Sequence, residues 1–124
     1  MILGFSKQFV APILIGIKIH TIREDKKGRW KAGTAIHMAT SVRTKQYQCF
    51  SSDYSCKGTQ FIDIRNFGEE KEVWVGGREL TTSEIELLAK NDGFKDVAAF
   101  WRWFPLDFSG KIIHWTDFRY EGGC

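Results

Sequence analysis

The amino-acid sequence predicts an α+β domain, in which short helices pack against a small mixed sheet or partly open barrel. Several short stretches alternate apolar and polar residues with the period of a strand, and three others space apolar residues as on one face of a helix. The chain has 124 residues, of which 43% are hydrophobic and 15% aromatic. A chain of this length buries roughly two-thirds of the surface that its unfolded form exposes. We therefore expect one domain over residues 1–124, stable without disulfides or a structural metal.

Apolar periodicity predicts a short N-terminal helix. Phe5, Phe9 and Ile13 repeat every four residues within residues 5–15, which places them on one helical face. Pro12 lies inside this helix and limits its length.

The remaining elements follow from alternation and capping signals. Residues 24–33 are charged and contain two glycines, so they are predicted to form a mobile connection. Alternation predicts strands at residues 35–42, 46–50, 61–66, 73–75 and 111–117. The pair Thr81 and Glu84 matches a capping box, which predicts a helix over 82–90, and a second helix is expected over 96–104.

Charge and hydropathy exclude two classes of protein. The 18 Lys and Arg residues nearly balance the 15 Asp and Glu residues, and the formal charge of +3 is far below that of a dedicated duplex-DNA binder. The longest apolar stretch, residues 9–17, has about half the length of a membrane-spanning helix. The first residues show neither the positive start nor the cleavage site of a secretory leader. We expect a cytoplasmic protein with no membrane partner.

The three cysteines do not indicate a metal or disulfide site. Cys49, Cys56 and Cys124 are odd in number and lack CxxC spacing. We expect a free buried thiol at Cys49 and an exposed thiol at Cys124, and the alternative is a bridge between Cys49 and Cys56. No metal and no organic cofactor is predicted.

The densest group of reactive side chains follows the N-terminal helix. Residues 17–23 alternate as in a strand, so Thr21 and Arg23 share one face. Lys18 is an odd number of residues from Thr21 and reaches the same side only from a bend after Gly16. Glycine permits such a bend because it adopts positive φ angles without steric cost.

The run GxKxxTxR at residues 16–23 resembles the signature of the ASCH domain family, relatives of the PUA RNA-binding fold. The resemblance extends over most of the chain: the charged turn ending in WKAG at 30–33, the sequence DGF at 92–94 after a helix, and a closing strand. It implies a PUA-like small β-barrel with flanking short helices. It also implies a cleft lined by the GxKxxTxR segment.

One branch of the ASCH family hydrolyses N4-acetylcytidine to cytidine and acetate, with a catalytic Lys, Thr and carboxylate of which Thr is the nucleophile. Lys18 and Thr21 match this set directly. The carboxylate of that branch is a Glu in the turn after the second helix, where this chain has Asp92. The resemblance therefore implies that Lys18, Thr21 and Asp92 are catalytic and that the substrate is an N-acylated pyrimidine nucleoside.

These residue types suit that chemistry. A threonine hydroxyl becomes a nucleophile when a neighbouring base takes its proton, and a lysine is such a base when burial or a nearby cation lowers its pKa. Arg23 is the candidate cation, and Asp92 would orient the Lys18 ammonium. The acyl oxyanion needs two donors, for which backbone N–H groups or Arg23 are the candidates.

Other residues are predicted to bind the substrate or RNA around the catalytic set. Trp101, Trp103 and Trp115 are candidates for an aromatic wall that stacks on a pyrimidine. Of these, Trp101 fits the apolar stripe of its helix and is expected in the core, which leaves Trp103 free to line a groove. His20 faces away from Thr21 and is expected at the rim or in a structural role, and His37 and His114 are expected to be satisfied structural histidines. The predicted binding residues are Arg23, His20, Lys27, Arg29, Trp30 and Trp103.

The alternative hypothesis is a non-catalytic RNA- or nucleotide-binding module. In it Lys18, Arg23, Lys27 and Arg29 hold phosphates while aromatic rings stack on the bases of single-stranded RNA. Its affinity would fall steeply with salt, because phosphate contacts release counterions. A protein-interaction domain is a third possibility, for which the sequence gives no positive sign.

Overall fold

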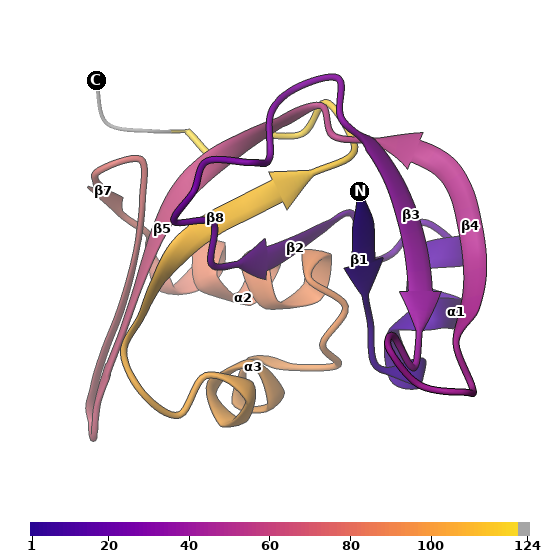
Figure 1. The fold of residues 1–124 in the computed structure, drawn as a ribbon. Helices are drawn as coiled ribbons and strands as arrows, with labels where there is room; N and C mark the ends of the chain where they lie inside the picture. The colour runs from indigo at the N-terminus through magenta and orange to yellow at the C-terminus, as the bar shows by residue number, and fades with distance from the viewer. Residues whose placement is uncertain (122–124) are drawn as a thin grey trace.

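The computed structural model describes residues 1–121 and confirms the predicted α+β class (Figure 1). Within these residues the strands form two sheets, one with the order β1-β3-β4 and one with the order β2-β8-β5-β6-β7. These two sheets do not close into a single barrel in the described part of the chain. The same residues contain no helix long and apolar enough to cross a membrane.

The three-stranded sheet contains the N-terminus. Strand β1 (Ile2–Gly4) runs parallel to β3 (Ala35–Thr40), which pairs antiparallel with β4 (Gln48–Ser55). The N-terminal ammonium donates a hydrogen bond to the backbone oxygen of Ala35 at 2.6 Å. The sequence did not predict β1, because three residues are too few to show a period.

The five-stranded sheet is antiparallel throughout and contains the predicted site segment at its edge. Its strands in spatial order are β2 (His20–Arg23), β8 (Phe108–His114), β5 (Gly58–Phe67), β6 (Glu70–Val75) and β7 (Arg78–Glu79). Strand β8 begins and ends three residues before the predicted strand at 111–117. The difference arises because Phe108 already pairs with Ile64 of β5.

The helical residues follow the predicted positions, as η1 (Lys7–Phe9), α1 (Val10–Leu14), α2 (Thr82–Asn91) and α3 (Val97–Trp103). The predicted capping box is confirmed at α2, since Thr81 Oγ1 accepts from Glu84 N at 3.3 Å and Glu84 Oε1 accepts from Thr81 N at 2.9 Å. Asp96 caps α3 by accepting from Ala99 N at 2.8 Å. Both helices cover one face of the five-stranded sheet (Figure 1).

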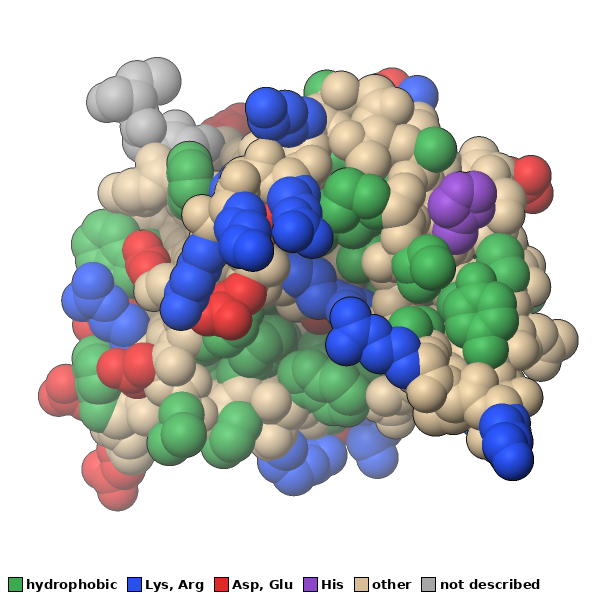
Figure 2. All heavy atoms as spheres, in the orientation of Figure 1, with side chains coloured by type: hydrophobic (Ala, Val, Ile, Leu, Met, Phe, Trp, Pro, Cys, Tyr) green, Lys and Arg blue, Asp and Glu red, His purple; other side chains and the backbone are tan. Residues whose placement is uncertain are grey.

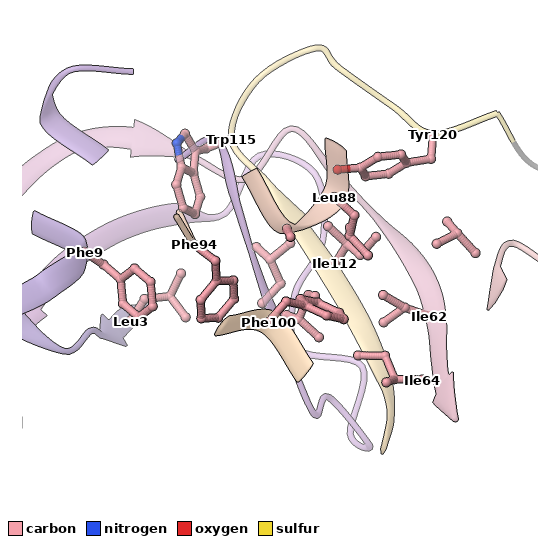
Figure 3. Packing of buried hydrophobic residues seen from close by; sticks show 14 of the residues in the cluster. Leu3, Phe9, Ile62, Ile64, Leu88, Phe94, Phe100, Ile112, Trp115 and Tyr120 are labelled. Atoms are coloured by element: carbon pink, nitrogen blue, oxygen red, sulfur yellow. The ribbon is translucent and has the colours of Figure 1, made fainter. Parts of the chain in front are cut away.

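The core lies between this sheet and its two helices. Ile62, Ile64 and Ile112 point toward Leu88 of α2 and Phe100 of α3 (Figure 3), and all five side chains are almost completely buried. The alternation of β5 produces this arrangement, because its odd-numbered residues 61, 63 and 65 are exposed. Each such buried side chain contributes about 1.5–3 kcal/mol to folding.

Two predicted cleft-lining tryptophans belong to the core instead. Trp30 is 7% exposed and Trp115 is 4% exposed, and both are members of the buried hydrophobic cluster. Trp30 is turned inward because Asp25 holds the loop: its carboxylate accepts from Trp30 N at 3.0 Å and from Arg29 N at 2.8 Å. Lys111 of β8 also donates to Asp25 at 3.1 Å, so the segment predicted as a mobile connection is tied to the sheet.

The cysteine and histidine predictions are correct in part. Cys56 is buried and Cys49 is exposed, the reverse of the expectation for Cys49, and neither forms a disulfide within residues 1–121. Cys124 lies outside the described residues. His114 is fully buried; its Nε2 bonds to Gln60, but its Nδ1 has no hydrogen-bond partner among residues 1–121, so the prediction of a satisfied histidine holds for one ring nitrogen only. His37 is exposed on β3, and its Nδ1 lies 3.1 Å from Ser52 Oγ.

Candidate active site

A cavity of about 370 Å³ lies beside β2, the edge strand of the five-stranded sheet. Its walls come from the chain after β1, from β2, from the turn after α2 and from α3. The predicted residues on its lining are Lys18, Thr21, Arg23, Asp92 and Trp103. Figure 2 shows Lys and Arg side chains gathered in the upper middle of the molecular face that Figure 1 presents.

Lys18 reaches the cavity through the bend that the sequence predicts after Gly16. Gly16 has a φ of +83°, and β2 begins only at His20. The backbone N–H groups of residues 17 and 18 both donate to the Pro12 oxygen at 2.9 Å, which folds the bend back onto α1. The Lys18 side chain is consequently 2% exposed, an unusual burial for a lysine.

The turn after α2 supplies the partner of this lysine. Lys18 Nζ donates to the backbone oxygen of Asp92 at 2.6 Å and to its Oδ1 at 3.2 Å. Gly93 follows with a φ of +94°, and a Cβ there would lie 3.0 Å from both Lys18 Cδ and Phe9 Cδ1. This glycine therefore ends the helix and leaves the space that the lysine stem occupies.

Burial dominates the electrostatics of Lys18. It lowers the pKa of the Lys18 amine below its usual value, the carboxylate of Asp92 opposes this shift, and the positive charge of Arg23 adds to it. The amine lies 4.7 Å from the Phe9 ring centroid and 5.7 Å from the Phe5 ring centroid. These rings keep water from the amine, which disfavours its charged form, while their faces attract the ammonium and oppose part of this effect.

Thr21 and Arg23 share one face of β2, as their spacing predicts. Arg23 Nε donates to Thr21 Oγ1 at 3.1 Å, and a terminal guanidinium nitrogen donates to Gly4 O at 2.6 Å. The hydroxyl of Thr21 accepts from a cation and keeps its own proton for donation. A cationic donor stabilises negative charge that develops on this oxygen. Within residues 1–121, Thr21 and Lys18 line the same cavity without a hydrogen bond between them.

His20 lies behind the site rather than in it. The prediction that it binds substrate is wrong, because its side chain is 0% exposed and faces the interior. Its Nδ1 lies 3.1 Å from Asp92 Oδ1 and its Nε2 lies 2.7 Å from the Tyr120 hydroxyl. Asn91 Nδ2 donates to the same hydroxyl at 3.2 Å. Sequence reasoning missed Tyr120, which is 100 residues from His20 and belongs to no motif.

An aromatic wall borders the cavity. Phe9, Phe94 and Trp103 pack edge to face or tilted, with centroids 5.4–5.7 Å apart. Trp103 is 48% exposed, and of the tryptophans predicted as wall residues it is the one that lines the cavity. Trp101 packs against the core as expected. Phe9 and Phe94 were not predicted as wall residues, since their spacing indicates only burial.

The other predicted binding residues lie away from the cavity. Trp30 is in the core, so its predicted contact with substrate is wrong. Lys27 and Arg29 are exposed and line a separate shallow depression, which shares Glu24 with the cavity. The structure thus brings Lys18, Thr21 and Asp92 together and leaves the basic loop outside.

Comparisons with known proteins give no further evidence about the site. No family model, curated protein or solved structure matches the chain. Residues 1–121 contain no group of three or more His, Cys, Asp and Glu side chains arranged to hold a metal ion. The function is therefore inferred from the cavity and its own side chains.

Proposed function

We propose that the chain is an amidohydrolase that removes the acyl group from an N-acylated pyrimidine nucleoside such as N4-acetylcytidine. One observation carries the proposal: the buried Lys18 amine, the Thr21 hydroxyl and the Asp92 carboxylate line one cavity of about 370 Å³. Pockets that hold small organic ligands typically have about 300–1,000 Å³. The site thus combines a base, a nucleophile and an orienting carboxylate in a space of suitable size.

The contacts of Lys18 favour its role as the base. A neutral amine has two N–H bonds and one lone pair, and Asp92 offers two acceptors, at 2.6 and 3.2 Å. With both N–H bonds directed to Asp92, the lone pair points to the remaining side of the nitrogen. Burial lowers the pKa of the amine, which provides the neutral form.

The proposed reaction begins with attack of Thr21 Oγ1 on the acyl carbonyl carbon. The Thr21 proton passes to Lys18 Nζ as the new C–O bond forms, and Arg23 stabilises charge on the reacting oxygens. The carbon–nitrogen bond to the pyrimidine then breaks, and the Lys18 proton moves to the departing amino group. Water hydrolyses the resulting acyl-threonine ester, which releases the carboxylic acid and restores both side chains.

The aromatic wall would hold the pyrimidine. Trp103 is exposed at the cavity and is supported from behind by Phe9 and Phe94. Stacking of a base on an aromatic ring contributes about 1–3 kcal/mol without selecting the base. We expect the acyl group to lie on the side of Thr21 and the ring on the side of Trp103.

The same residues support a relationship to the ASCH family and its PUA-like barrel, which we include in the proposal together with a cytoplasmic location. Three features of the GxKxxTxR residues support this part of the proposal: the bend at Gly16, the burial of Lys18 and the hydrogen bond from Arg23 to Thr21.

Release of cytidine from N4-acetylcytidine by the purified protein tests the proposal. We expect the wild type to be active and Thr21→Ala to lose at least about 10³-fold in kcat/KM, because no nucleophile remains. Thr59→Ala is the matched control, since Thr59 and Thr21 both pair with Ile113 in one cross-strand row. An inert wild type, or equal activity of wild type and Thr21→Ala, would exclude the proposed role of Thr21.

RNA or nucleotide binding is the second candidate function, favoured by the exposed basic loop. Lys26, Lys27 and Arg29 surround a shallow depression next to the cavity. A paired substitution, Lys27→Gln with Arg29→Gln, should weaken binding of single-stranded RNA and flatten its dependence on salt, with Lys45→Gln as an exposed control. Binding that does not change with salt would argue against this function.

A further inference from the structure

A chain of buried and partly buried hydrogen bonds connects the candidate catalytic carboxylate to the C-terminal segment that contains Tyr120. It runs from Asn91 to Tyr120, from Tyr120 to His20 and from His20 to Asp92, with distances of 3.2, 2.7 and 3.1 Å. Tyr120 and His20 are buried and neither lines the cavity. The catalytic roles proposed above do not use this chain.

The chemistry of the groups fixes the direction of each bond. The carboxylate of Asp92 only accepts, so Nδ1 of His20 carries the proton. Burial lowers the pKa of His20 and keeps the ring neutral, so its Nε2 has a lone pair and accepts from the Tyr120 hydroxyl. Burial also raises the pKa of the Tyr120 phenol, which therefore remains a donor. The free lone pair of this oxygen accepts from Asn91, so both ring nitrogens of His20 and the hydroxyl of Tyr120 have partners.

One oxygen atom of Asp92 links the chain to the site. Oδ1 accepts from His20 Nδ1 at 3.1 Å and from Lys18 Nζ at 3.2 Å. The terminal torsion of an aspartate is broad, so a single donor would leave the carboxylate free to rotate. Two donors from different segments of the chain, Lys18 and His20, restrict it, and the restricted carboxylate in turn orients the amine.

We propose that Tyr120 and His20 are positioning residues, which hold Asp92 in the orientation that directs the Lys18 lone pair into the cavity. This inference rests on the proposed hydrolase function. It makes the C-terminal segment part of the site, although that segment contributes no atom to the cavity lining.

The anchoring of Tyr120 permits a clean test. Its backbone N–H donates to Gln60 Oε1 at 3.0 Å, and its backbone oxygen accepts from Gln60 Nε2 at 2.7 Å. These bonds hold the residue on β5 whether or not the side chain carries a hydroxyl. Tyr120→Phe therefore removes one oxygen atom and leaves the segment in place.

The first experiment compares the hydrolysis kinetics of three variants. We expect Tyr120→Phe to lower kcat by about 10-fold to 10²-fold with KM unchanged, because the base is misaligned while the cavity is intact. The ascending limb of its pH–rate profile should move to lower pH, because a less closely held Asp92 favours the Lys18 ammonium less. His20→Asn, whose amide can still donate to Asp92, should retain more activity than His20→Leu.

Tyr54→Phe is the matched control, since Tyr54 is half-buried on β4 and its hydroxyl makes no hydrogen bond within residues 1–121. It should leave kcat, KM and the pH profile unchanged. Equal pH profiles for wild type and Tyr120→Phe, or equal activity of the two His20 variants, would overturn the positioning role.

The second experiment uses ¹⁵N NMR of the side chains and does not depend on hydrolysis. Near neutral pH we expect the Nδ1–H tautomer for His20 and a fall in the Lys18 pKa on going from wild type to Tyr120→Phe. A cationic His20, its Nε2–H tautomer, or an unchanged Lys18 pKa would exclude the inference. If the NMR results are as expected but wild type does not cleave N4-acetylcytidine, the positioning of Lys18 stands and the proposed substrate is wrong.

Discussion

Two basic regions lie close together in this protein and differ in almost every physical respect. Lys18 is buried, bonded to Asp92 and in contact with the Phe9 ring, whereas Lys27 and Arg29 are exposed on a loop. Water surrounds the loop side chains and screens their charges. Burial changes the chemistry of Lys18, because it penalises the charged form. The contrast shows that environment, rather than residue type, separates a candidate base from a solvated cation.

The largest expected difference in kcat/KM is between variants in which Lys18 or Lys27 is replaced by an uncharged residue. Lys18→Met should reduce kcat/KM for N4-acetylcytidine by at least about 10³-fold, because the base is lost while the side-chain volume is kept. Lys27→Met should change it by less than about two-fold, since Lys27 does not line the cavity. Steady-state kinetics of both variants would measure the difference. Similar losses in the two would show that the burial of Lys18 has no catalytic consequence.

The same contrast between buried and exposed groups applies to the histidines and predicts acid destabilisation. Burial, assisted by the positive charge of Arg119, lowers the pKa of His114 to about 3, against 6.5 in the unfolded chain. Between these values the unfolded state binds the extra proton, so the protein loses stability as the pH falls below about 6.5, by up to about 1.4 kcal/mol per pH unit.

Urea unfolding at several pH values would measure this slope. His114→Gln should reduce it, whereas His37→Gln, on the exposed face of β3, should leave it unchanged. A wild-type stability that is constant between about pH 4 and pH 6.5 would contradict the burial of a neutral His114.

Substituting one glycine in each region would show how tightly each is packed: Gly93 lies beside Lys18, and Gly28 lies in the basic loop. Gly93 and Gly28 both have positive φ, at +94° and +64°, but only Gly93 has neighbours within 4 Å of an added Cβ. Gly28→Ala should cost about 1 kcal/mol for the backbone conformation alone. Gly93→Ala should cost about 2–3 kcal/mol, because the methyl group also displaces Lys18 or Phe9. Chemical denaturation would measure the loss of unfolding free energy in each variant. Equal losses for Gly28→Ala and Gly93→Ala would mean that the Lys18 side chain is loosely packed.

Salt gives the smallest expected effect on the candidate site. Hydrolysis of a neutral nucleoside should vary by less than about two-fold between about 0.05 and about 0.5 M salt, because the buried pair of Lys18 and Asp92 is poorly screened. Any RNA binding through Lys27 and Arg29 should weaken strongly over the same range. Parallel salt titrations would separate the two regions, and a strongly salt-dependent hydrolysis rate would indicate that the loop takes part in it.

Local signals accounted for several parts of the structure. The capping box begins α2 where Thr81 and Glu84 predict it, because its hydrogen bonds join residues three apart. The bend at Gly16 and the Thr21–Arg23 pair also depend on neighbours in the chain. Contacts between distant segments were not predictable in this way. Trp115 packs against Phe5 and Tyr54, and Lys111 of β8 holds Asp25 in the loop that turns Trp30 inward.

The sequence by itself determined the α+β class and most helix positions, and its resemblance to the ASCH family suggested Lys18, Thr21 and Asp92 as a candidate site. Only the tertiary structure decided which of these side chains meet. Asp92 is 74 residues from Lys18, and Tyr120 is 100 residues from His20. Periodicity reports which face of an element is buried, but it carries no information about the partner on the other side. The pairing of β2 with β8 and the packing of α2 against the sheet supply that partner, and with it the burial that changes the chemistry of Lys18.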